Sequence, residues 1–90
     1  MSGDYTRYFS SFEKKVFNSM MEAYDASEYK KSLTLADKVL VNHPDHAECN
    51  AFKALVLNAS RHKEEAIKLI SDTLMKNMKN FTCWHVQGMI

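Results

Sequence analysis

Apolar residues recur every three or four positions along most of this chain, which is the spacing of one face of an α-helix. The pattern predicts four complete short helices and the start of a fifth, and no segment alternates with the period of a strand. The stripes of the four complete helices are Phe12, Val16, Met20 and Ala23; Tyr29, Leu33, Ala36, Val39 and Leu40; Cys49, Phe52 and Val56; and Ala66, Leu69, Ile70, Thr73 and Leu74.

Local signals place the ends of these helices. Ser10 stands three residues before Glu13, a capping-box pattern that marks the start of the first helix. Pro44 ends the second helix because proline disfavours a helical residue before it, and Asp45 is predicted to cap the third. The fifth helix is expected to start near Phe81.

The helical pattern repeats after about 34 residues, the period of tetratricopeptide (TPR) proteins. Small residues then meet small ones at the expected helix crossings, and apolar residues meet apolar ones. The sequence therefore predicts an all-α fold of TPR-like helical hairpins stacked as a short right-handed solenoid. The expected divisions are a disordered N-terminus at 1–9, repeat 1 at 10–46, repeat 2 at 47–80, and the first helix of a third repeat at 81–90. An ordinary helical bundle with accidental spacing is the alternative.

Five residues are predicted to form the structural core at the helix crossings. They are Tyr29, Ala54, Ala66, Trp84 and Gly88. The pair Trp84 and Gly88 supplies the large-then-small spacing that a TPR expects in its first helix. We expect Trp84 to wedge between neighbouring helices, where a large aromatic side chain buries much of its surface.

Composition excludes several classes of function. The chain has 90 residues with 2 Gly and 1 Pro, so it lacks the glycine-rich loops that hold phosphates and nucleotide cofactors. The net charge is +1, which does not indicate a dedicated nucleic-acid-binding domain. We predict no catalytic, cofactor-binding or metal-binding residues and no membrane segment. The two cysteines form no disulfide framework, which favours a cytosolic or nuclear location with reduced thiols, and we predict the cytoplasm.

One group of metal-ligand residue types has helical spacing. His43, His46 and Cys49 stand three residues apart, and nitrogen and sulfur ligands of this kind bind zinc. A structural zinc site needs four ligands, and no fourth lies close in the sequence. We therefore interpret the segment as a loop between repeats that is followed by a buried cysteine.

The first helices of the two repeats are predicted to line a concave groove. Its candidate partner-binding residues are Phe17, Met21, Phe52 and Leu55. These side chains cannot hold a carboxylate by charge, which disfavours a chaperone-tail adaptor. An apolar groove suits an amphipathic helix of a partner, or else the next turn of the same superhelix.

Basic residues gather at the two turns within the hairpins. Lys30 and Lys31 open the second helix of repeat 1, and Arg61 and Lys63 occupy the equivalent turn of repeat 2. Stacked repeats would align them along one edge, where they could contact ribosomal RNA phosphates without reading sequence. The alternative, which the small net charge favours, is a solvated edge balanced by nearby glutamates.

The second half of the chain carries a more specific resemblance. Lys63-Glu64-Glu65-Ala66, followed by Cys83-Trp84-His85-Val86-Gln87-Gly88, resembles the N-terminal repeats of the large auxiliary subunit of the NatA N-terminal acetyltransferase. The resemblance implies a non-catalytic scaffold that organises a separate catalytic acetyltransferase subunit, through regions beyond these residues, and helps the complex dock at the ribosome. A generic TPR adaptor of another complex is the alternative.

The last residues are apolar at helical spacing, with no cap and no polar tail. We therefore expect the chain to be the N-terminal piece of a longer protein. We also expect the isolated piece to self-associate through its exposed last helix.

Overall fold

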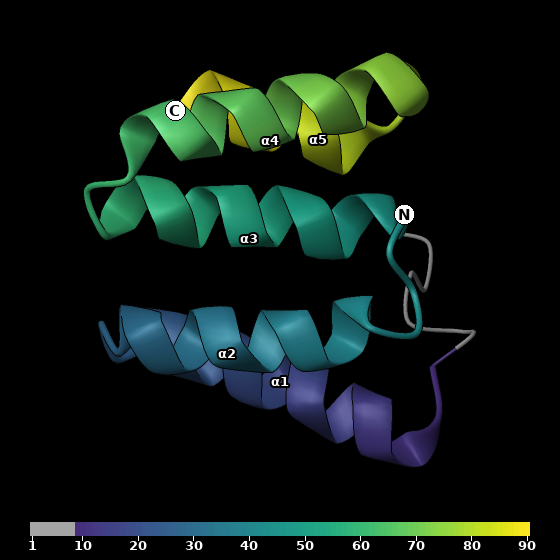
Figure 1. The fold of residues 1–90 in the computed structure, drawn as a ribbon, viewed down its shortest axis with the longest axis vertical. Coiled ribbons are helices and arrows are strands. Elements are labelled where there is room, and N and C mark those ends of the chain that lie inside the picture. Colours follow the sequence, from purple (N-terminus) through teal and green to yellow (C-terminus); the bar gives the residue numbers. More distant parts are fainter. Residues whose placement is uncertain (1–8) are drawn as a thin grey trace.

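The computed structural model describes residues 9–90, and the five elements of this range are all α-helices. They are α1 (Ser11–Asp25), α2 (Tyr29–Leu40), α3 (Ala47–Ala59), α4 (Lys63–Lys76) and α5 (Phe81–Met89). Figure 1 shows α1 and α2 as one antiparallel hairpin, α3 and α4 as a second hairpin stacked on it, and α5 beside α4. The predicted all-α fold of stacked hairpins is confirmed. The division of the chain into repeats at 46 and 80 stays a prediction.

The turn within each hairpin shows the 34-residue repeat directly. Ser27 and Arg61, 34 positions apart, are the non-glycine residues with positive φ in the described range, at 63° and 69°. In both turns the next backbone N–H donates to a carbonyl five residues earlier, at 2.8 Å. This pairing is a Schellman motif, which satisfies carbonyls at the end of a helix. Both helices that open a hairpin therefore end in the same way.

Side chains at equivalent positions of the repeat cap α3 and α5. Asp45 was expected to cap α3, and this prediction was wrong: Asp45 lies in the preceding turn, and His46 is the cap. Its Nδ1 accepts a hydrogen bond from the Cys49 backbone N–H at 3.1 Å. Asn80, 34 positions later, accepts in the same way from Cys83 at 3.0 Å. These bonds satisfy amide groups that the first turn of a helix leaves without a partner.

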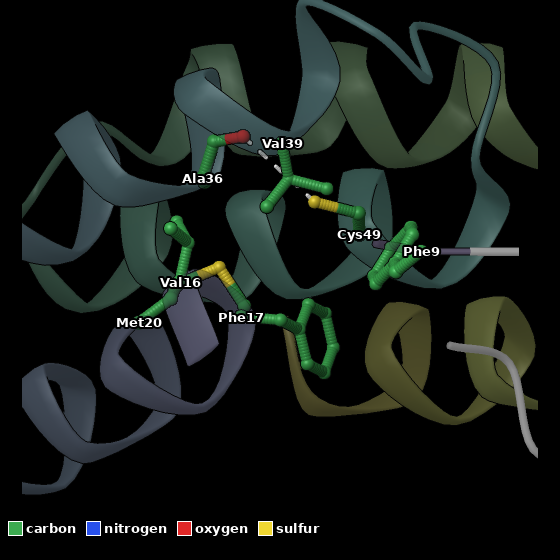
Figure 2. Close-up of a cluster of buried hydrophobic side chains, with 7 residues drawn as sticks. All are labelled: Phe9, Val16, Phe17, Met20, Ala36, Val39 and Cys49. Atoms are coloured by element: carbon green, nitrogen blue, oxygen red, sulfur yellow. Dashed lines mark hydrogen bonds between the residues drawn. The ribbon is translucent and has the colours of Figure 1, made fainter. Parts of the chain in front are cut away.

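The first hydrophobic core fills the space between α1, α2 and the start of α3 (Figure 2). Its buried members are Phe9, Val16, Phe17, Met20, Ala36, Val39 and Cys49. Phe9 corrects a prediction, because residues 1–9 were expected to be disordered. Its side chain is only 6% exposed, and its ring centroid lies 5.8 Å from that of Phe17. Residues 1–8 of that predicted segment lie outside the described range.

The second core joins α3, α4 and α5 and is built from smaller residues. Its buried members are Ala47, Ala51, Ala54, Ile70, Leu74, Cys83 and Val86. Alanines on α3 let α5 approach closely. The methyl side chain of alanine takes up less space between two helices than a phenylalanine ring does. Ala54 and Ala66, which the repeat pattern places at helix crossings, have no exposed surface.

Two of the predicted core residues are not buried in this structure. Trp84 is 48% exposed, and its indole N–H donates to the Met78 carbonyl rather than packing in a wedge between helices. A Cβ added at Gly88 would meet nothing within 4 Å, so no close helix contact requires glycine there. Both residues lie on a face of α5 that no described helix covers. Tyr29, the remaining member of the predicted core, is half-buried beside Tyr24.

Candidate interaction site

Three of the four predicted groove residues line one shallow slot between α1 and α3. Met21 lies on α1, whereas Phe52 and Leu55 lie on α3, one helical turn apart. Phe17 does not line the slot and is buried in the first core. Its ring meets that of Phe52 edge to face, with centroids 5.8 Å apart. This contact holds Phe52 in place as one wall of the slot.

The slot has a volume of about 90 Å³ and an apolar floor. Its lining comes from three helices: Met20, Met21, Tyr24 and Asp25 of α1, Ser32 of α2, and Phe52, Leu55 and Val56 of α3. The Ser32 hydroxyl donates to the Met20 carbonyl at 2.9 Å, so its proton is already used within the protein. Among the lining residues, the Asp25 side chain is the charged one.

The slot exists because the two hairpins do not repeat perfectly. α1 and α3 approach each other much less closely than α3 and α5 do. Phe17 and Met20 of α1 stand 34 positions before Ala51 and Ala54 of α3, so large side chains replace small ones at equivalent places. Their volume holds α1 away from α3 and leaves an opening beyond them.

The predicted basic residues lie on one side of the molecule but not in one pocket. Figure 1 shows the α1–α2 and α3–α4 turns on the same side of the stack. Lys30 and Lys31 line an open hollow at the first turn, and Arg61 and Lys63 lie exposed at the second. Within residues 9–90, none of these four side chains forms an ion pair. The glutamates that were expected to balance the edge therefore do not pair with it.

The three residues with zinc-ligand spacing are engaged in the fold. His46 caps α3, and His43 Nε2 lies 3.1 Å from Glu13 Oε1. Burial raises the pKa of the Cys49 thiol to about 12, which disfavours the thiolate that binds metals. In the part of the chain that the structure describes, no three histidine, cysteine or acidic side chains are grouped to hold a metal ion. Likewise, no helix of residues 9–90 is long and apolar enough to cross a membrane.

Glu13 has a role that the sequence did not indicate. Besides completing the capping box with Ser10, its carboxylate accepts a hydrogen bond from Asn42 at 3.0 Å and contacts His43. The Ser10 backbone N–H, then Asn42 and His43, lower the pKa of Glu13 to about 2. The partners lie about 30 residues away, so the local capping pattern alone could not identify them.

A family comparison matches residues 13–87 to the Psidin N-terminal TPR repeats region. This chain belongs to that family. The match covers both hairpins and most of α5, in agreement with the 34-residue repeat of turns and caps. The resemblance to the NatA auxiliary subunit, predicted from the motifs around Ala66 and Trp84, is confirmed by individual relatives.

Among the relatives of this Psidin-family chain is the N-terminal acetyltransferase A complex auxiliary subunit NAA15 of Arabidopsis thaliana, 36% identical over 78 residues. The human N-alpha-acetyltransferase 16, NatA auxiliary subunit, is 32% identical over 80 residues. Each alignment covers 87% of this chain and 9% of the relative, so the chain spans about a tenth of the length of these proteins.

A solved structure shows the same fold. A chain of the structure titled "Structure of Naa15/Naa10 bound to HypK-THB" superposes with a TM-score of 0.80 at 35% sequence identity. The superposition covers 88% of this chain and 12% of that chain. The arrangement of α1 to α5 is therefore that of a known TPR stack.

Proposed function

We propose that this chain is the N-terminal repeat segment of a non-catalytic TPR scaffold subunit in a NatA-type N-terminal acetyltransferase complex. The observation that carries the proposal is the agreement of sequence and fold: 36% identity to a plant NatA auxiliary subunit and a TM-score of 0.80 to a chain of an Naa15/Naa10 structure. The catalytic acetyltransferase subunit would bind regions beyond these 90 residues.

A structural rather than catalytic role fits the chemistry of the side chains. Burial raises the pKa of Cys83 to about 11 as well as that of Cys49, so both thiols stay protonated near neutral pH and are poor nucleophiles. His43 and His46 are committed to contacts that hold the α2–α3 loop. These groups stabilise a rigid stack of hairpins, which is what a scaffold requires.

Purification of the endogenous protein with an antibody against residues 9–90 tests this proposal. We expect mass spectrometry to find a small acetyltransferase together with a chain several times longer than this one. A short protein without an acetyltransferase would overturn the scaffold proposal and favour the alternative, a generic TPR adaptor of another complex. A matched precipitation with pre-immune antibody serves as the control.

We further propose that Lys30, Lys31, Arg61 and Lys63, here called the basic edge, contact the ribosome. This contact would place the complex in the cytoplasm, where nascent chains emerge. Support comes from the shared side of the two turns and from the four cations, which form no ion pair with a carboxylate of residues 9–90. Contacts of this kind to RNA phosphates weaken steeply as salt concentration rises.

Charge reversal tests the ribosome contact. Replacing Lys30, Lys31, Arg61 and Lys63 by glutamate should reduce co-sedimentation with ribosomes at low salt. The matched control reverses four other exposed lysines, namely Lys14, Lys15, Lys38 and Lys68. Both variants have the same net charge. Equal co-sedimentation of the two variants with ribosomes would therefore overturn the proposal that this edge is the contact.

A further inference from the structure

We propose that the slot between α1 and α3 docks a helical segment of a partner protein that presents one aliphatic side chain and, one turn later, an arginine or lysine. This inference rests on the proposed scaffold function and specifies the partner chemistry of its groove. Amphipathic helices commonly bind grooves of this kind through a few apolar anchors.

The volume of the slot sets the size of the anchor. A dry cavity of about 150 Å³ holds benzene, which has six carbon atoms. The slot of about 90 Å³ is therefore suited to a side chain of four carbons, such as leucine or isoleucine. Met21, Phe52 and Leu55 form its walls, and all three are half-buried, so they offer apolar surface that an incoming side chain can cover.

The position of Asp25 sets the charge of the partner. Asp25 is the last residue of α1 and lies one turn beyond Met21, on the rim of the slot. An acidic residue is unfavourable at the C-terminus of a helix, and the last turn of α1 has no basic residue. Its exposed carboxylate forms no ion pair with residues 9–90. A cation on the partner, about one turn from the anchor, would compensate this charge.

The slot is held in shape by contacts that do not depend on a ligand. The Phe52 ring packs against the buried Phe17 ring, and the Tyr24 ring packs against the Tyr29 ring with centroids 6.0 Å apart. Lys30 and Lys31 of the basic edge line a different hollow, to which Asp25 does not contribute. The slot and the basic edge are therefore separate surfaces, and variants can test them independently.

A display library of 12-residue helical peptides, randomised on one face, provides the probe. Selection uses the 90-residue chain, with counter-selection against Met21→Trp, whose larger side chain fills the slot without adding a polar group. We expect enriched peptides to carry leucine, isoleucine or methionine followed three or four positions later by arginine or lysine. They should bind the chain at least about tenfold more tightly than Met21→Trp.

The matched control is Met75→Trp, which places the same residue at an exposed methionine of α4, outside the slot. This control should leave binding unchanged. Equal loss of binding in both variants, or no enrichment over Met21→Trp, would overturn the proposal. Analytical sedimentation gives a further test. A dimer of the chain that dissociates on Met21→Trp substitution would also overturn the proposal, because the occupant of the slot would then be a second copy.

A charge exchange tests the second half of the proposal. Asp25→Lys should weaken the binding of arginine-bearing peptides about fivefold and restore tight binding when that arginine is replaced by glutamate. The matched control is Asp72→Lys on α4, which should change neither affinity. Asp25→Lys suits the helix dipole, so circular dichroism should show an intact fold. Enriched peptides without a basic residue would refute the assigned charge.

The two proposals fail separately. If no such peptide binds while the acetyltransferase still co-purifies with the endogenous protein, the slot proposal is wrong and the scaffold proposal stands. If the acetyltransferase is absent from the purified complex, the scaffold proposal is wrong, and with it the functional setting of the slot.

Discussion

Glu13 on α1 and His43 in the α2–α3 loop meet at 3.1 Å, between Oε1 and Nε2, although 30 residues separate them in the chain. The other carboxylate oxygen accepts a hydrogen bond from Asn42 at 3.0 Å. One side chain thus caps α1 and ties the start of the first hairpin to the loop that leads into the second. This contact joins the shared core and the Phe17–Phe52 ring contact in linking α1 to the segment that leads into α3.

The carboxylate of Glu13 should make stability depend on acid. Hydrogen bonds from Ser10, Asn42 and His43 lower its folded-state pKa from 4.5 to about 2. Because the folded pKa is lowered, its stabilising contribution is complete above about pH 4.5 and is lost as the pH falls toward 2. We expect Glu13→Gln to flatten this decrease, measured as the urea midpoint between pH 2 and 5.

Glu22→Gln is the matched control, because Glu22 lies exposed on the same helix. It should leave the acid dependence of the urea midpoint as it is in the parent chain. If Glu13→Gln and the parent lose stability with the same slope below pH 4.5, then the bridge from α1 to the loop does not contribute as described.

Both thiols should be unreactive in the folded protein. Burial raises the pKa of Cys49 to about 12 and that of Cys83 to about 11. Because these folded-state values lie above the ordinary value of 9.0, the stability gained by burying neutral thiols is complete below about pH 9 and is lost as the pH rises. We expect a thiol reagent at pH 7.5 to label neither cysteine until denaturant is added.

A free-thiol peptide of unstructured sequence gives the reference rate for that labelling. Reaction of either cysteine in the folded chain within a factor of ten of this rate would contradict the burial of the thiol. Mass spectrometry after digestion assigns the label to Cys49 or Cys83, so each pKa shift is checked separately.

Glycine should stabilise the two hairpin turns. Ser27 and Arg61 hold the left-handed conformation, which costs an L-residue about 1–2 kcal/mol and costs glycine almost nothing. Ser27→Gly should raise the free energy of unfolding by about 0.5–1 kcal/mol, and Arg61→Gly should do the same. Ser19→Gly, within α1, should lower it by a similar amount. Denaturant titrations that show the same sign at all three positions would contradict the turn geometry.

Truncation of Trp84 should cost less than truncation of Ile70. Trp84 is 48% exposed, whereas Ile70 is 1% exposed in the second core. We expect Trp84→Ala to lower the free energy of unfolding of the 90-residue chain by about 1 kcal/mol. Ile70→Ala, which leaves a cavity among α3, α4 and α5, should lower it by about 2–5 kcal/mol. The reverse order in urea unfolding would show that Trp84 packs more deeply than the structure places it.

Local patterns in the sequence were sufficient for the helices and their repeat. The three-and-four spacing of apolar residues, the break at Pro44 and the capping box at Ser10 involve residues within one or two turns of each other. Such short-range preferences act before tertiary contacts form, so they predicted the all-α fold. The one wrong cap, Asp45, was displaced by a single residue because the turn after Pro44 continues to His46.

The sequence by itself therefore determined the helices through apolar spacing, the equivalent turns through the repeat period, and the family resemblance through the motifs around Ala66 and Trp84. Tertiary structure alone decided which of the repeat positions are covered: Phe9 is buried, whereas Trp84 is exposed. It also decided that Phe17 closes the first core while Phe52 walls a slot. Trp84 is exposed because no described helix covers that face of α5. The slot depends on how far large side chains hold α1 from α3, a distance set by packing between residues more than 30 positions apart. No local pattern encodes that distance.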